Sequence, residues 1–142
     1  MNAHLPNRLL AAAGLLALAA CASAAPHPAS IDDLVGAWLL EAAIPAGARL
    51  PTLNIAADGT LHGNSGVNRF RGAIDPKALA EGRWRATDLA GERKAGAADA
   101  MQLENQFLRA LASADRAVVS GDRVLLQRGD EQLAALVRWG RR

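Results

Sequence analysis

Short segments with alternating apolar and polar residues dominate the chain from Ile31 onward, and they predict a β-rich domain. These segments cover 34–40, 53–55, a return that begins at 61, then 70–74, 84–88, 117–120, 123–127 and 132–139. The turns between them include Asp58-Gly59, Asp75-Pro76, Gly121-Asp122 and Gly129-Asp130. Because tight turns join antiparallel neighbours, the last three segments predict a β-meander. In its final strand, Arg138 shares a face with Ala134 and Leu136.

One segment has helical periodicity instead. Its apolar residues recur on one helix face and are Leu103, Phe107, Leu108 and Leu111. We therefore predict an amphipathic helix over about 100–112, with Asp99 and Gln102 in a capping pattern at its N-terminus. A lone amphipathic helix must bury its apolar face, and the sheet is its expected partner. The predicted fold is α+β, with a curved antiparallel sheet or partial barrel packed on one amphipathic helix.

The N-terminal segment has the pattern of an export signal. Arg8 precedes an unbroken apolar run from Leu9 to Ala20. That run is too short for a membrane span, which needs roughly 20 apolar residues, and we predict a signal peptide over 1–20. Leu18-Ala19-Ala20-Cys21 resembles the bacterial lipobox, in which the cysteine is acylated and becomes the first residue. Residues 21–30 are then a lipidated tether, and residues 31–142 form one domain.

Two locations follow from the two possible cleavage sites. A lipidated Cys21 followed by Ala22 implies, by resemblance to lipoproteins of Gram-negative bacteria, the periplasmic face of the outer membrane. Ala22-Ser23-Ala24 before Ala25 also fits ordinary signal peptidase, which would release a soluble periplasmic protein.

Composition narrows the possible functions. Sixteen basic residues against fourteen acidic ones, with interspersed signs, form no basic stripe for nucleic acid. The single cysteine excludes an internal disulfide, and beyond Ile31 the one histidine is His62. Since transition-metal sites normally use several His or Cys ligands, we expect no metal, and we expect no cofactor. No glycine-rich nucleotide-binding loop is present.

We expect no catalytic residues. A Ser-His-Asp site would need His62 with Ser65, Ser113 or Ser120, and the segment 63–66 departs from G-x-S-x-G. The aspartates beside glycine have turn roles. Glu104, near the edge of the apolar stripe, is expected to reach an arginine or a loop backbone, because an unpaired buried carboxylate is costly.

One segment identifies a family. It reads Gly63-x-Ser65-Gly66-Val67-Asn68-Arg69-Phe70-x-Gly72. This resembles the signature of the META-domain family, commonly G-x-x-G-C-N-x-F/Y-x-G, to which the heat-inducible HslJ-like envelope lipoproteins belong. Leu34-x-Gly36-x-Trp38 and Met101-x-x-Glu104-x-x-Phe107 match further landmarks. We interpret Gly63, Gly66, Asn68, Arg69, Phe70 and Gly72 as a structural signature. Arg69 and Arg71 are either solvated charges or contacts for an anionic partner.

The chain departs from the family at two positions. Val67 and Gly96 stand where relatives commonly have cysteines. Because both cysteines are absent together, we predict that the two positions are neighbours in space. Their absence puts in doubt any redox or disulfide-linked role of relatives.

The resemblance implies a non-enzymatic envelope lipoprotein in heat or antibiotic tolerance. The alternative is a small binding lipoprotein, either a carrier of an apolar ligand or an inhibitor-type or pilot-type protein with an envelope partner. An enzyme ranks third. A cavity beneath the helix would favour ligand binding, and a filled core with an exposed apolar patch would favour a macromolecular partner.

Overall fold

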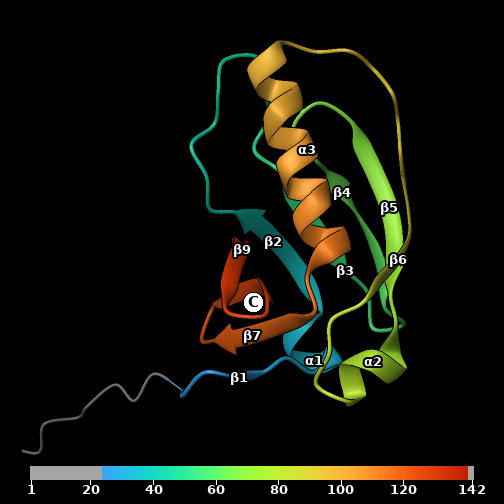
Figure 1. Ribbon diagram of the computed structural model, residues 1–142, viewed down its shortest axis with the longest axis vertical. Coiled ribbons are helices and arrows are strands. Elements are labelled where there is room, and N and C mark those ends of the chain that lie inside the picture. Colours follow the sequence, from blue (N-terminus) through green and yellow to red (C-terminus); the bar gives the residue numbers. More distant parts are fainter. Residues whose placement is uncertain (1–23, 141–142) are drawn as a thin grey trace, which may run out of the picture.

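One antiparallel sheet organises the computed structural model, which describes residues 24–140. Its strand order is β1-β7-β8-β9-β2-β3-β4-β5-β6, and the sheet curls into a half-barrel (Figure 1). The strands are β1 (His27–Pro28), β2 (Gly36–Leu40), β3 (Thr52–Ile55), β4 (Thr60–Asn64), β5 (Arg69–Ile74), β6 (Ala86–Gly91), β7 (Arg116–Ser120), β8 (Arg123–Arg128) and β9 (Glu131–Arg138). The predicted α+β fold and C-terminal meander are confirmed.

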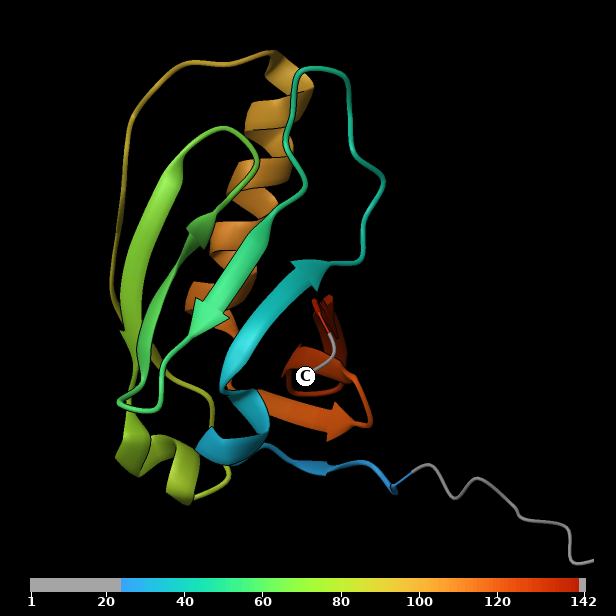
Figure 2. The ribbon, with the colours of Figure 1, turned by 180° about the vertical axis from the view of Figure 1, so that it is seen from behind.

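Three helices accompany the sheet in the described part of the chain. They are α1 (Ile31–Leu34), α2 (Pro76–Ala80) and α3 (Ala98–Ser113). The long helix α3 lies against the inner face of the half-barrel, as the views from the two sides show (Figures 1 and 2). There its stripe joins residues that alternate along the strands, including Trp38, Leu53, Leu61 and Leu126. The rings of Phe70 and Phe107 meet edge to face, with centroids 5.8 Å apart.

The start of α3 corrects the capping prediction. Ala97 occupies the cap position and makes no side-chain cap hydrogen bond, while Asp99 lies inside the first turn. An acidic side chain there still favours the helix, because its charge complements the positive end of the helix dipole.

The fold also begins earlier than the predicted domain boundary at residue 31. β1 pairs with β7, aligning His27 with Val119, and Ala29 is buried. The hydroxyl of Ser30 and the carboxylate of Asp33 form a capping box at α1. Residues 27–30 are therefore part of the domain rather than of a tether.

Two other elements differ from the prediction. The segment 34–40 is not one strand, because the capping box places residues 31–34 in α1 and Gly36, at φ +126°, redirects the chain into β2. Asp75-Pro76 ends β5 as predicted, but it also begins α2, whose first amides donate to the Asp75 carboxylate. β6 starts at Ala86, so Trp84 precedes it.

The packing of α3 predicts that Phe107→Ala destabilises the domain by about 3–5 kcal/mol through loss of buried contacts and creation of a cavity. Urea unfolding of the chain from residue 24, followed by tryptophan fluorescence, measures the change. Arg109→Ala, an exposed position on the same helix, is the matched control and should shift stability by no more than about 0.5 kcal/mol. Equal effects of the two substitutions would contradict the packing.

Candidate functional site

The family motif forms the β4–β5 hairpin and its loop. The loop closes where the amide of Ser65 donates to the carbonyl of Asn68 at 2.9 Å. Gly66 has φ +125°, a conformation that L side chains rarely adopt. At Gly63 the backbone of β3 comes so close that a Cβ atom would lie 1.9 Å from the Thr52 carbonyl oxygen. The predicted glycine roles, positive φ and close backbone approach, are both present.

Glu104 of α3 points into this loop and is 4% exposed. Its Oε2 accepts from the Asn68 amide at 2.8 Å and from the Val67 amide at 3.2 Å. The Ser65 hydroxyl lies 2.8 Å from the same oxygen. Oε1 accepts from Asn68 Nδ2 at 2.8 Å. Of the two predicted partners for Glu104, the loop backbone is the one that the structure provides.

Asn68 extends the network to a third segment. Its Nδ2 also donates to the Lys94 carbonyl at 3.0 Å, and its Oδ1 accepts from the Lys94 amide at 2.8 Å. Asn68 is 2% exposed. We call Ser65, Asn68 and Glu104 the buried polar cluster, and this cluster ties the hairpin loop, α3 and the segment after β6 together.

The electrostatics of the cluster favour an ionised carboxylate. Burial acts to raise the pKa of Glu104, but hydrogen bonds from Asn68, Ser65 and Val67 outweigh burial and hold the pKa below its usual range. Neutral groups donate every hydrogen bond that the described structure gives this carboxylate. The charge is therefore stabilised by oriented dipoles rather than by a neighbouring cation.

The remaining motif residues occupy the two faces of β5. Phe70 is buried against α3, and Leu89 packs over Gly72. Arg69 points outward and pairs with Glu92, 2.9 Å away. Hydrogen bonds from the side chain and the backbone amide of Arg69, helped by its charge, lower the pKa of Glu92 to about 2. Arg71 is exposed.

Among the hydrogen bonds of the described residues, none joins His62 to Ser65, the first candidate pair for a Ser-His-Asp site. His62 is exposed on β4, whereas the hydroxyl of Ser65 is buried and engaged by Glu104 and by the Asn68 carbonyl. Asp58 accepts from the Thr60 amide, which is a turn role. Within residues 24–140 no group of three or more His, Cys, Asp and Glu side chains is placed to hold a metal ion.

The two family cysteine positions are adjacent, as predicted from their joint absence. A Cβ atom built on Gly96 would lie 2.8 Å from Cγ2 of Val67. The valine methyls occupy the space that a side chain at position 96 would need.

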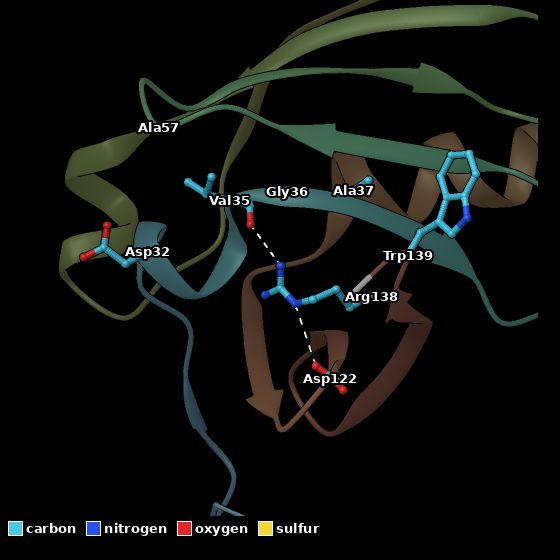
Figure 3. Close-up of a pocket in the computed structure, with 9 residues that line it drawn as sticks. Asp32, Val35, Gly36, Ala37, Ala57, Asp122, Arg138 and Trp139 are labelled. Atoms are coloured by element: carbon cyan, nitrogen blue, oxygen red, sulfur yellow. Dashed lines mark hydrogen bonds and ion pairs between the residues drawn. The ribbon is translucent and has the colours of Figure 1, made fainter. Parts of the chain in front are cut away.

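A cleft of about 780 Å³ lies where α1, β2 and the end of β9 meet (Figure 3). Arg138 lies at its centre, and its guanidinium is 4.2 Å from the centroid of the buried Trp38 ring. The guanidinium donates to the carbonyls of Asp33 and Val35, at 2.7 and 3.0 Å, and thereby satisfies the C-terminal end of α1. Sequence alternation grouped Arg138 with inward residues, but nothing in the sequence indicated this stacking.

Beside Arg138, Trp139 is 58% exposed at the mouth of the cleft. Asp122 lies 3.9 Å from the guanidinium, and Asp32 lies at the far end of the cleft from Trp139 (Figure 3). The polar contacts of Arg138 at the centre of the cleft stabilise the fold. The exposed indole of Trp139 is the feature of the cleft to which we assign no role inside the domain.

Comparisons with known proteins place the chain in a family. The META domain model matches residues 32–139, and the chain therefore belongs to the META-domain family. No curated protein matches it. The solved NMR structure of a protein from Burkholderia xenovorans is similar, with 22% identity, a TM-score of 0.65, and coverage of 99% of this chain and 100% of that chain. This likeness shows the fold. No helix in residues 24–140 has the length and apolar character to cross a membrane.

Cys21 and the predicted signal peptide lie outside the described residues.

The Glu104 contacts predict a specific acid sensitivity. Because the folded pKa lies below the ordinary value of 4.5, this carboxylate contributes full stability above that pH, and its contribution is lost as the pH falls through the folded pKa. Glu104→Gln should lower the free energy of unfolding at pH 7 by about 1–3 kcal/mol, because an amide NH₂ then faces a donor. It should also flatten the dependence of stability on pH below 4.5.

Urea titrations at several pH values measure both effects. Glu131→Gln, at the exposed pair with Arg128, is the control and should leave stability at pH 7 nearly unchanged. A Glu104→Gln protein with wild-type stability at pH 7 would show that the cluster does not hold the fold.

Proposed function

We propose that this META-domain protein is a non-enzymatic bacterial envelope lipoprotein, similar to the HslJ-like proteins, that acts by binding in heat or antibiotic tolerance. Acylated Cys21 holds it on the periplasmic face of the outer membrane. The alternative location is the soluble periplasm, if cleavage follows Ala24.

The observation that carries this proposal is the internal use of the motif's polar groups. Glu104 and Asn68 are buried, and the loop, the helix and the segment at Lys94 satisfy their hydrogen-bonding atoms. A catalytic carboxylate needs access to substrate and a pKa suited to proton transfer. A buried carboxylate with a lowered pKa and only neutral donors meets neither need, which supports a binding role for the domain.

The packing beneath α3 favours a surface partner over an enclosed ligand. Phe70, Phe107 and Trp38 fill the space between helix and sheet together with aliphatic residues. Exposed apolar groups such as Trp139 lie on the outside instead. The second candidate, a carrier of a small apolar ligand, has one supporting feature. This is an open groove of about 310 Å³ between α3 and β6, where Leu89 and Leu108 contribute apolar walls.

The anchor is the part of the proposal that one substitution tests. Cys21→Ser should move the protein from the membrane fraction into unprocessed precursor or soluble material, because acylation requires the cysteine thiol. Fractionation of cells and N-terminal sequencing measure the outcome, and Ser23→Ala, which leaves the lipobox intact, is the matched control. Unchanged membrane partitioning of the Cys21→Ser protein, or a native N-terminus at Ala25, would rule out the lipid anchor.

A further inference from the structure

Apolar residues cluster on the outer surface of one half of the sheet. In β2, β7, β8 and β9 the core takes alternate residues, such as Leu40, Val119, Leu126 and Leu136. Because side chains alternate between the faces of a strand, the residues between them point away from the core. The outward apolar residues are the partly buried Leu39, Val118, Leu125 and Val137, the buried Ala135 and the exposed Trp139, and we call this set the outer apolar face.

The register makes this face continuous. Val118 aligns with Leu125, and Leu125 aligns with Ala135. In the next row Val137 aligns with Leu39, and Trp139, whose amide donates to the Ala37 carbonyl just after β9, continues the alternation on this face. Directly aligned side chains on one face are in contact range, so these residues form a single patch.

The other half of the same surface is polar. Across β3, β4 and β5 the aligned outward residues are Asn54, His62 and Arg71. The apolar character is therefore local to one half of the sheet. A continuous apolar surface that carries one large exposed side chain, Trp139, is a candidate interaction site.

Charged residues border the apolar face. Arg123 lies beside Val137 in the same row and pairs with Glu41, and Arg116 lies beyond Val118 on β7. An exposed indole next to aliphatic side chains, with arginines at the border, is the composition that suits the boundary between lipid headgroups and acyl chains.

The position of the N-terminal chain indicates which partner covers this face. β1 pairs with β7, so the chain enters the domain at the edge of the apolar half. Five residues lie between Cys21 and His27, and the six residue steps of an extended chain span at most roughly 20 Å. A lipid on Cys21 therefore keeps a bilayer within reach of this edge, at a high effective concentration.

We propose that the outer apolar face docks on the lipid bilayer, with Trp139 at the headgroup boundary. This inference rests on the proposed lipid anchor. Docking orients the domain, because the polar outer residues of β3 to β5 and the α3 groove then remain available to the periplasm.

Tryptophan fluorescence tests the docking directly, because Trp38 and Trp84 are buried at 0% and 3% exposure whereas Trp139 is exposed. The mature full-length protein, purified from membranes, is reconstituted in phosphatidylethanolamine and phosphatidylglycerol vesicles with or without brominated acyl chains. Bromine should quench the share of emission that Trp139→Phe removes. Val137→Glu should reduce the quenching. Asn54→Glu is the matched control, since it adds the same charge to a partly buried outward position on the polar half, and it should have no effect.

Flotation of the vesicles separates the two proposals. Protein that floats but shows no quenching of Trp139 would overturn the docking while leaving the anchor intact. If that protein also sediments as a dimer in detergent and Val137→Glu makes it a monomer, the face is an interface between two copies. Protein that does not float would overturn the lipid anchor. In that case, bromine quenching of Trp139 at a high vesicle concentration would test the docking of the outer apolar face by itself. The quenching of Trp139 in the wild-type protein decides whether the face docks, so the test of docking does not depend on whether Val137→Glu folds.

Discussion

The carboxylate of Glu104 is the contact on which the rest of the structure depends. It is the only group on α3 that reaches the hairpin loop through Ser65, Val67 and Asn68 among the described hydrogen bonds. A buried charge of this kind is tolerated only when donors are already in place, so helix and loop must fold together. The positive φ of Gly66 lets the loop direct its amides at Glu104. The Asn68 side chain then links the loop to the backbone of Lys94 through two further hydrogen bonds.

Around this contact the domain divides into parts with different tasks. The motif half, β3 to β6 with α3, holds the buried polar cluster and presents a polar outer face. The other half closes the sheet around Trp38, with Arg138 stacked on its ring, and it presents the outer apolar face. The proposed binding is thus assigned to the surface, whereas the family motif preserves the shape of the domain.

Local patterns predicted much of this architecture. Alternation and turns located the strands, the spacing of Leu103, Phe107 and Leu111 located α3, and Glu104 was expected to find partners because of its burial. Short elements were missed, since α1 and α2 depend on the caps at Ser30 and Asp75 rather than on periodicity. Long-range contacts were also beyond a single sequence. The Asn68–Glu104 pair joins residues 36 positions apart, and Arg138 reaches residues more than a hundred positions away.

A double-mutant cycle between Asn68 and Glu104 tests the central claim most directly. Urea unfolding of wild type, Asn68→Ala, Glu104→Gln and the double variant gives the coupling free energy between the two side chains. Because the pair is buried and directly hydrogen-bonded, the account predicts a coupling of more than about 1 kcal/mol. Additive single effects, with a coupling near zero, would contradict it and would leave the motif without its structural role.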